Sequence, residues 1–554
     1  MSGTTISGST PGPGAGGAPG QAASPPPARR SARFGPTGAV IAIATVLGLG
    51  LRLYQLSRPG FLLSVTEYDD GPYFGSAIRL VSGVIPYRDF LLVQPPGITL
   101  LMVPSALLGK LTGTAWAMAS GRLLTVLAST ACITLAGLLT RHRGIVAVTV
   151  ACGVTAIFPD AVRASHTVLV EPWVTFFCLL GALAVFDGDR PTASRKRLVW
   201  GGVAFGFAGA VEVWAIFPLA VAALLLLPSL RRLAACVAGA AAGFLIPVLP
   251  IAAVSPHGFY DGLVVAQVGG RANATRVPDW FRVQHMFGLS DFRFAHSTVM
   301  LAAAAITIGV AVLLVLVTAV TRQPLTSLEW FAVGSTVLIM AAFLWPPQFH
   351  YHFSAFLAPF LAMSVALPAA RLIQPPAAGS ADARPPALRR WADQPWFAGY
   401  VAFAAGVIIA LMSVIQLNSE ATSEPHVAYP TIVNAKRLIP PGACVVTDEV
   451  SLTIEADRFI SSVPGCPLLV DSIGTDYALS HGRNPATGAA TYPALVEVWR
   501  TMLGRAQYVW FSGREARRVP WTPELMAYFH QHFTQIMGDD GIHGLFKRNG
   551  PPQS

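Results

Sequence analysis

The sequence predicts a polytopic α-helical membrane protein with a small α/β domain at its C-terminal end. Three observations favour this class: of 554 residues, 53% are hydrophobic, only 12% are charged, and the mean hydropathy is +0.54. Soluble domains carry about 25% charged residues, so this chain has too little polar surface to enclose one water-soluble core. The composition excludes an ordinary cytosolic enzyme and argues against a nucleic-acid-binding protein, although the net charge is +10.

The N-terminal segment differs from the rest of the chain. Residues 1–35 are rich in Gly, Pro, Ser, Thr and Ala without periodicity, so we expect a disordered tail. The tail contains the basic residues Arg29, Arg30 and Arg33, and the apolar run Ala39–Leu56 that follows is long enough to cross a bilayer. Because basic residues favour the cytoplasmic side, we expect the tail to be cytoplasmic.

Eleven apolar segments predict a membrane domain over residues 36–417. After Ala39–Leu56 they lie at 116–139, 144–158, 167–186, 198–211, 214–229, 233–253, 297–320, 328–345, 353–373 and 397–417. Basic residues such as Arg141, Arg231 and Arg322 follow alternate spans and fall on the side of the N-terminus if segment 97–110 does not cross fully. We therefore expect 97–110 to be a re-entrant or surface-lying helix, and the C-terminus to lie outside the cell.

The stretch 198–229 can form one long helix or two short ones. Gly202 and Gly206 are four residues apart within it, a spacing that predicts close packing against another helix and not a nucleotide-binding loop.

The C-terminal part of the sequence has ordinary polarity. Residues 374–395 predict a flexible cytoplasmic linker. Residues 418–554 contain strand-like runs at 443–447 and 508–511 and helical patterns around 431–438, 493–504 and 523–534, so we expect a small extracytoplasmic α/β domain. Cys444 and Cys466 lie beside Pro/Gly turns there and predict a disulfide, with two unpaired thiols as the alternative.

The first predicted outer loop, residues 57–97, carries the strongest candidates for chemistry. Glu67, Asp69 and Asp70 lie within four residues just beyond a span. Carboxylates beside a bilayer are costly unless they are solvated, paired or used, and repulsion between neighbours can raise one pKa towards that of a general base. From the spacing alone, a catalytic loop and a solvated turn are equally consistent.

Three further segments carry charged or imidazole groups. Arginines can hold a phosphate by bidentate contacts, and the same residues would also serve a structural ion pair, lipid headgroups or an interfacial belt. His350 and His352 have no third ligand at a convincing spacing, so no metal site is predicted. The candidates from these segments are Asp160, Arg163, His166, Glu171, Arg271, Arg282, His350 and His352.

The order of these features resembles the GT-C superfamily of integral-membrane glycosyltransferases, over roughly residues 37–420. Asp69-Asp70 on the first outer loop and Pro95-Pro96 at the start of an apolar helix carry the resemblance. The nearer likeness is to the branch of protein mannosyltransferases, aminoarabinose transferases and actinobacterial mannosyl- and arabinosyltransferases. Aminoarabinose transferases often have Lys before Pro-Pro where this chain has Gln94, which leaves open the residue that holds the donor phosphate.

The resemblance implies an activity. It implies an inverting transfer of a sugar, mannose or arabinofuranose, from a polyprenyl-phosphate donor to an envelope glycan or glycolipid on the outer face of the plasma membrane. Asp69 would deprotonate the acceptor hydroxyl and Asp70 would orient it or bind substrate, with these two roles exchangeable. The donor-phosphate or substrate-binding candidates are Arg88, Gln94, Arg163, His166, Glu171, Arg271, Arg282, His350 and His352.

Cofactors, partners and alternatives follow from the same resemblance. No cofactor is implied with certainty, although a divalent cation is compatible with the acidic loop. The expected partners are the lipid-linked donor, the glycan acceptor and membrane lipids.

Only four of the 38 Lys and Arg residues are lysines, which is typical of a GC-rich genome such as that of an actinobacterium. The alternatives are a lipid or glycan transporter (a flippase) and a non-catalytic GT-C-like scaffold.

Overall fold

The structure is a computed structural model that describes residues 8–9, 35–373, 390–391, 394–481, 492–512, 519–538 and 543–553. By its internal contacts the chain divides into Met1–Gly35 and Pro36–Ser554, and the elements below belong to the second part. The predicted disordered tail and the predicted linker 374–395 lie almost wholly outside the described residues.

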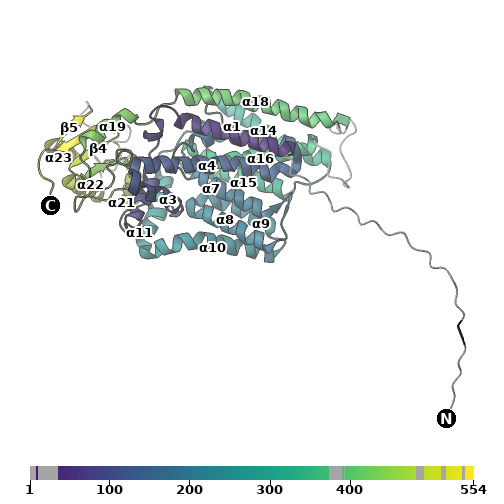
Figure 1. The fold of residues 1–554 in the computed structure, drawn as a ribbon, viewed down its shortest axis with the longest axis horizontal. Helices are drawn as coiled ribbons and strands as arrows, with labels where there is room; N and C mark the ends of the chain where they lie inside the picture. Colours follow the sequence, from purple (N-terminus) through teal and green to yellow (C-terminus); the bar gives the residue numbers. More distant parts are fainter. Residues whose placement is uncertain are drawn as a thin grey trace, which may run out of the picture. The chain divides into compact units, whose positions relative to one another are not determined.

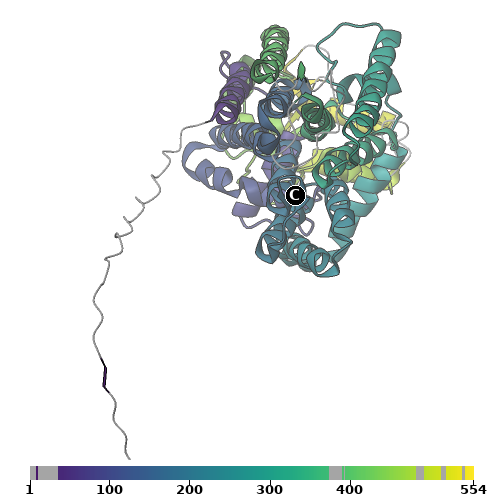
Figure 2. The ribbon, with the colours of Figure 1, turned by 90° about the vertical axis from the view of Figure 1, so that its right-hand side faces the viewer.

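A bundle of apolar helices forms most of this part (Figure 1), and Figure 2, which looks along the helices, shows them side by side. Each of the eleven predicted apolar segments coincides with a helix. The helices are α1 (Pro36–Leu56), α4 (Thr114–Thr140), α5 (Gly144–Ile157), α7 (Glu171–Val185), α8 (Arg195–Val211), α9 (Ile216–Leu226), α10 (Leu230–Val254), α14 (His296–Thr321), α15 (Ser327–Leu344), α16 (Ser354–Ile373) and α18 (Pro395–Thr422). The predicted polytopic helical fold is confirmed.

The number of helices does not by itself give the number of membrane crossings. Within the described residues, seven helical stretches are long and apolar enough to cross a membrane. One of them, Thr114–Ile157, contains both α4 and α5, which pack against each other after the 3₁₀ turn η2 (Arg141–Arg143) and Gly144 at φ +81°. The helices α7 and α9 are apolar but shorter than a straight span, so the total of eleven crossings stays a prediction.

The predicted stretch 198–229 forms two helices, α8 and α9, joined by the 3₁₀ turn η3 (Val213–Ala215). Helix α8 packs backbone to backbone on α10 through four glycines. A Cβ built at Gly202 or Gly206 would lie 2.0 Å from a carbonyl oxygen of α10, and one built at Gly239 or Gly243 would lie 2.2 Å from a carbonyl oxygen of α8. No side chain fits at these distances, so the glycines do form the predicted small-residue packing face.

Shorter elements connect the long helices. The segment predicted not to cross forms α3 (Gly97–Thr112), which packs on α2, α4 and α8. The predicted first outer loop contains the twelve-residue helix α2 (Asp70–Val81). The other connecting elements are η1 (Phe61–Leu63), α6 (Pro159–Arg163), β1 (Phe186–Asp187), β2 (Arg190–Pro191), α11 (Pro256–Tyr260), the π-helix η4 (Asp261–Gly269), α12 (Gly270–Asn273), α13 (Asp279–Met286) and η5 (Tyr351–Phe353).

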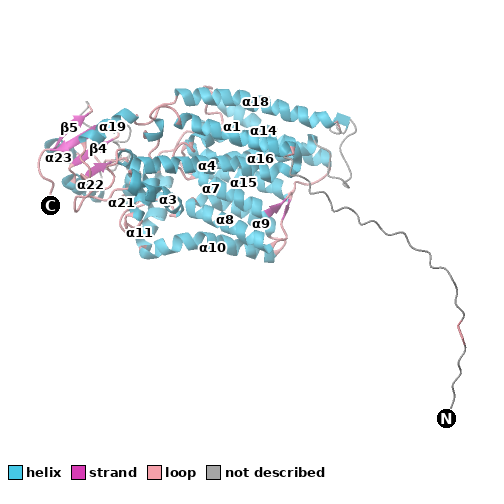
Figure 3. Cartoon of the chain, in the orientation of Figure 1, coloured by secondary structure: helices cyan, strands magenta, loops and turns pink. Residues whose placement is uncertain are grey.

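The C-terminal part is a small α/β domain, as predicted. Its four-stranded sheet has the order β3-β4-β6-β5, with β3 and β4 parallel and the other two pairs antiparallel. The hairpin β1–β2 lies at the opposite end of the bundle from this sheet (Figure 3). The domain's elements are α19 (Tyr429–Leu438), β3 (Val445–Thr447), α20 (Val450–Glu455), α21 (Ser472–Leu479), α22 (Pro493–Arg505), β4 (Tyr508–Phe511), α23 (Pro523–His532), β5 (Phe533–Met537) and β6 (Gly544–Arg548).

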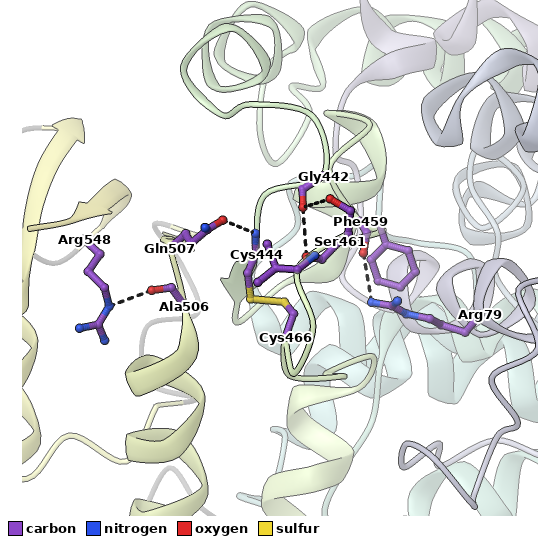
Figure 4. Close-up of a disulfide and its surroundings, with 11 residues drawn as sticks. Arg79, Gly442, Cys444, Phe459, Ser461, Cys466, Ala506, Gln507 and Arg548 are labelled. Carbon is purple, nitrogen blue, oxygen red and sulfur yellow. Dashed lines mark hydrogen bonds between the residues drawn. A yellow bond between two sulfur atoms is a disulfide. The ribbon is translucent and has the colours of Figure 1, made fainter. Parts of the chain in front are cut away.

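A disulfide and side chains of the sheet and helices hold this domain together. Cys444 and Cys466 form the disulfide, with Cα atoms 5.5 Å apart (Figure 4). Trp499, Phe511 and Phe529 pack in the core between the sheet and the helices. Burial of these three large aromatic side chains stabilises the domain.

Candidate active site

A cavity of about 230 Å³ lies where the helical bundle meets the C-terminal domain. Segments that are far apart in the sequence form its walls, from the loop before α2 to helix α21 of the C-terminal domain. The described residues that line it are Glu67, Tyr68, Asp69, Pro72, Tyr73, Val93, Gln94, Glu171, Ala266, Gln267, Gly270, Gln348, His350, Tyr351, His352, Phe353, Asp471, Ile473, Gly474 and Tyr477.

Three of the predicted residues meet on one wall of this cavity. His352 lies between two carboxylates: its Nδ1 is 2.8 Å from Glu171 Oε1, and its Nε2 is 3.5 Å from Asp69 Oδ2. The side chains of His352 and Glu171 are buried, while that of Asp69 is 29% exposed. An imidazole makes both contacts attractive only by presenting a proton on each nitrogen. A buried His–Glu pair therefore orients Asp69 at the edge of the cavity, as a general base requires.

Glu67 and Gln94 add polar groups to the same cavity. The hydroxyl of Tyr351 donates a 2.6 Å hydrogen bond to Glu67 Oε1, and burial raises the pKa of Glu67 above its usual range. Gln94 donates through Nε2 to the Tyr73 hydroxyl at 3.1 Å, and its buried Oε1 has no hydrogen-bond partner among the described residues. Gln94 is thus a predicted residue that lines the cavity, with an acceptor available for a ligand hydroxyl.

The C-terminal domain contributes Asp471, which precedes α21. Its Oδ1 accepts a 3.1 Å hydrogen bond from the Tyr68 hydroxyl and a 2.8 Å bond from the backbone N–H of Gly474. Burial raises the pKa of Asp471 to about 6. The sequence gives no signal for this residue, because an aspartate in a domain of ordinary polarity is unremarkable until the fold brings it to the cavity.

Asp70, which the sequence pairs with Asp69, does not line the cavity. Its side chain is fully buried: Oδ2 lies 3.0 Å from Arg122 Nη2 and accepts from the Thr167 hydroxyl, while Oδ1 accepts a 2.6 Å bond from Ser451. Asp70 begins α2, so its side chain leaves the backbone in a different direction from that of Asp69. Asp69 contacts His352 within the site, whereas the buried contacts of Asp70 keep its side chain out of the described cavity lining.

Arg163 and His166 lie in another cluster. Arg163 pairs with Asp291 and donates to the hydroxyls of Ser290 and Ser419, each at 3.0 Å. His166 is 3.7 Å from Glu420, and burial lowers its pKa to about 3, which leaves it uncharged. The structure does not bring either residue to the cavity, and carboxylates and hydroxyls from distant segments already engage Arg163.

Of two more predicted arginines, one is described in full by the structure and does not line the cavity. Arg88 is exposed and forms a 2.7 Å ion pair with its neighbour Asp89. The side chain of Arg271 lies outside the described residues, although Gly270, which precedes it, lines the cavity.

Arg282 does not line the cavity but supports the segment that carries His350 and His352. It is buried and donates to the carbonyl oxygens of Phe343, at 2.7 Å, and of Pro347. The segment then turns so that His350 lines the cavity beside Gln348, whose Nε2 is 2.8 Å from the His350 Nε2. The structure thus places Arg282 behind the site and His350 in it.

The lining residues do not form a metal centre. Within the described part of the chain, no three His, Cys, Asp or Glu side chains are grouped closely enough to hold a metal ion. The titratable acids and imidazoles that line the cavity are Glu67, Asp69, Glu171, Asp471, His350 and His352. This set suits hydrogen bonding to hydroxyls and proton transfer.

The fold is similar to solved membrane glycosyltransferases. It matches ArnT from Cupriavidus metallidurans bound to undecaprenyl phosphate with a TM-score of 0.56 and 14% identity, over 92% of this chain and 98% of that one. The apo form of that protein gives 0.54 and 13%, over 92% and 97%. The oligosaccharyltransferase AglB from Archaeoglobus fulgidus, in complex with an inhibitory peptide and a dolichol-phosphate, gives 0.48 and 12%, over 90% and 72%.

ArnT is a GT-C glycosyltransferase, and the chain described here has the GT-C fold. The fold expected from the resemblance is therefore confirmed. No protein-family model and no curated protein sequence matches this chain. At 14% identity the likeness concerns the fold, so activity must be argued from the site.

Proposed function

We propose that this chain is an inverting glycosyltransferase that moves a sugar from a polyprenyl-phosphate donor to a hydroxyl of an envelope glycan or glycolipid. The observation that carries the proposal is the meeting of Asp69, His352 and Glu171 at one cavity in a GT-C fold. The similar fold of ArnT, which was solved with undecaprenyl phosphate, supports a lipid-linked donor. Among sugars, we propose mannose or arabinofuranose.

The reaction is a single displacement. Asp69 takes the proton of the acceptor hydroxyl, the acceptor oxygen forms a bond to the anomeric carbon, and the bond from that carbon to the phosphate oxygen breaks. Polyprenyl phosphate leaves with the bonding electron pair, and the configuration at the anomeric carbon inverts. His352 and Glu171 hold the Asp69 carboxylate at the cavity edge, so the base does not need to be reoriented during the reaction.

The remaining lining groups bind the substrates. Carboxylates accept hydrogen bonds from sugar hydroxyls, a role that suits Glu67 and Asp471. His350, beside Gln348, is the candidate for the leaving phosphate, because His352 is already engaged by two carboxylates. Arg271 follows a lining residue in a basic segment of the sequence and is the candidate for a second phosphate contact.

We propose that the cavity faces the outside of the plasma membrane, with the N-terminus cytoplasmic and the C-terminal domain extracytoplasmic. The basic residues between predicted spans support this orientation, and so does the disulfide Cys444–Cys466, because disulfides persist in oxidising compartments. The acids of the cavity lie on loops and helix ends. A transporter would carry such groups near the middle of its spans, so the arrangement favours transfer over transport.

Asparagine substitution of Asp69 tests the proposal. Membranes with wild-type protein, Asp69→Asn or the control Asp89→Asn, a carboxylate of the same loop that pairs with Arg88, are supplied with labelled polyprenyl-phosphate mannose or arabinofuranose and endogenous acceptors. We expect Asp69→Asn to lose about 10²- to 10⁴-fold in transfer rate with an unchanged unfolding temperature, and Asp89→Asn to keep its activity. Full transfer by Asp69→Asn would overturn the assignment.

A further inference from the structure

We propose that the C-terminal domain positions the catalytic loop through a buried charge network, in which Arg122, Ser451 and Glu455 are positioning residues for Asp69. The inference deepens the proposed function and rests on it in so far as Asp69 is the base. It assigns to the C-terminal domain a part in catalysis beyond the side chains that line the cavity.

Arg122 is the centre of this network. It lies on α4, and its guanidinium is fully buried between the bundle and the C-terminal domain. Its Nη2 is 3.0 Å from Asp70 Oδ2 and 2.9 Å from Glu455 Oε1, and its Nη1 donates to the carbonyl oxygen of Leu62 at 2.6 Å. One guanidinium therefore joins α4, the segment that leads to the catalytic loop, and α20 of the C-terminal domain.

The network ends one peptide bond from the candidate base. Asp70 accepts a 2.6 Å hydrogen bond from Ser451 of α20, and Asp69 is its immediate neighbour in the chain. Because Asp70 is the first residue of α2 and is held from both the bundle and the domain, a shift of α20 moves the backbone that carries Asp69. A displacement of about 1 Å can cost about 10²-fold in rate in an active site.

The contact between α2 and α20 leaves no room for adjustment. A Cβ built at Gly71 would lie 2.4 Å from Ser451 Oγ and 2.7 Å from the Ser451 backbone nitrogen. Further along α2, Arg79 donates to the carbonyl oxygen of Phe459 at 3.0 Å and stacks over its ring (Figure 4). The Thr114 hydroxyl at the start of α4 donates to the carbonyl oxygen of Ile454 at 2.6 Å. The C-terminal domain thus packs tightly against both α2 and α4.

The charges in the network balance when Glu455 is protonated. Its carboxyl faces Arg122 and Asp70, with Asp457 nearby in the same domain, and burial raises its pKa to about 8. At pH 7 the Glu455 carboxyl is therefore mostly neutral. A glutamine at position 455 has the shape and neutrality of the protonated acid, and it serves as the conservative variant.

The experiment compares kinetics with local hydrogen exchange in the full-length protein in detergent. Arg122→Gln leaves Asp70 buried without its charge partner, so the deciding variants are Ser451→Ala and Gly71→Ala, which keep every charge. The matched control is Ser462→Ala, an exposed serine of the same domain that donates to the carbonyl oxygen of Gly442. Glu455→Gln, assayed at pH 7, tests rescue by the isosteric neutral side chain.

We expect Ser451→Ala and Gly71→Ala to lower kcat about tenfold, with KM for the polyprenyl-phosphate sugar within about twofold. Amide exchange over residues 66–73 should become faster, while Ser462→Ala and Glu455→Gln behave as wild type. Unchanged kcat in both deciding variants would overturn the proposal, whether or not exchange or the unfolding temperature changes, because the network would then only hold the domain in place.

The two proposals fail in different ways. If the wild-type protein transfers no sugar from either donor, the proposed function fails. In that case the amide hydrogen exchange of residues 66–73 still measures whether the C-terminal domain holds this loop. Unchanged exchange in both deciding variants would then overturn the proposal that the domain positions the loop.

Discussion

At the scale of single residues, two adjacent aspartates have opposite surroundings. Asp69 reaches the cavity and His352, whereas Asp70 is fully buried against Arg122 and Ser451. The division follows from helix geometry, because successive side chains at the start of a helix leave the backbone in different directions. Asp69 therefore faces the cavity, whereas Asp70 is fixed between the helical bundle and the C-terminal domain.

The raised pKa of Asp471 leads us to expect a pH-dependent rate of sugar transfer. Burial raises its pKa to about 6, so the carboxylate that would bind sugar hydroxyls becomes protonated as the pH falls through 6. We expect kcat/KM of the wild type to fall below pH 6, and Asp471→Asn to lose this part of the profile while its rate is about tenfold lower at pH 7. Rates measured from pH 5 to pH 8 on both proteins check this.

The sign of the stability effect separates protonation from unfolding. A raised folded-state pKa means that the folded protein binds this proton more tightly than the unfolded chain does. The contribution of Asp471 to stability is therefore fully present below its unfolded pKa and is lost as the pH rises through the folded value of about 6. The assignment would be contradicted if the wild type lost activity at acidic pH together with a drop in its unfolding temperature, and if Asp471→Asn abolished that drop.

At this scale the sequence predicted part of the cavity lining that forms the candidate site. Asp69, Gln94, Glu171, His350 and His352 line the cavity, because polar residues at the ends of apolar segments have few roles other than structural pairing or substrate contact. The sequence placed Asp160 near Arg163, but the other partners, Asp291 and Glu420, were not predictable because they are far away in the chain. A signal did exist for Arg122: an arginine within a predicted span needs a buried partner.

At the scale of elements, the contact between α8 and α10 requires glycine. We expect Gly206→Ala to lower the free energy of unfolding by about 2 kcal/mol, since its Cβ would lie 2.0 Å from the Ala240 carbonyl oxygen. Gly209→Ala is the matched control, because its Cβ would lie 3.5 Å from the Phe244 ring, an ordinary contact. Unfolding monitored in detergent checks both, and equal stability of the two variants would show that the helices can separate freely.

The segment that precedes α16 depends on Arg282. We expect Arg282→Ala to lower kcat/KM about tenfold, because the bonds to the Phe343 and Pro347 carbonyl oxygens fix the path of the chain to His350. Arg276→Ala, which removes an exposed ion pair with Asp279, serves as the control. Kinetics with the labelled donor measure the effect, and wild-type kinetics in Arg282→Ala would show that the segment holds its position unaided.

The long elements were predictable from the sequence and the short ones were not. Each predicted apolar segment became a helix, because hydropathy over about 20 residues is a strong signal. Helices α20 and α21 were missed, since they have only six and eight residues and no extended apolar periodicity. Yet these two supply Ser451, Glu455 and the wall beside Asp471, so the least predictable elements complete the site.

At the scale of the whole molecule, the disulfide stabilises the domain that docks on α2. Cys444 and Cys466 are 22 residues apart, and a loop of this length predicts a loss of about 3 kcal/mol when both become serine. We expect the double variant to unfold at a lower temperature and to lose transfer activity on warming before the wild type does. Dithiothreitol should reproduce the loss in the wild type and leave the double variant unchanged; an equal response of both would rule out this role.

The distribution of the network along the chain has a consequence for biosynthesis. Arg122 and Asp70 leave the ribosome long before Ser451 and Glu455, which contact them in the folded chain. The proposed base, Asp69, and His352, which contacts it, are likewise some 280 residues apart in the chain. A nascent or truncated chain that stops before Ser451 therefore lacks the side chains that complete the contacts of Arg122 and Asp70.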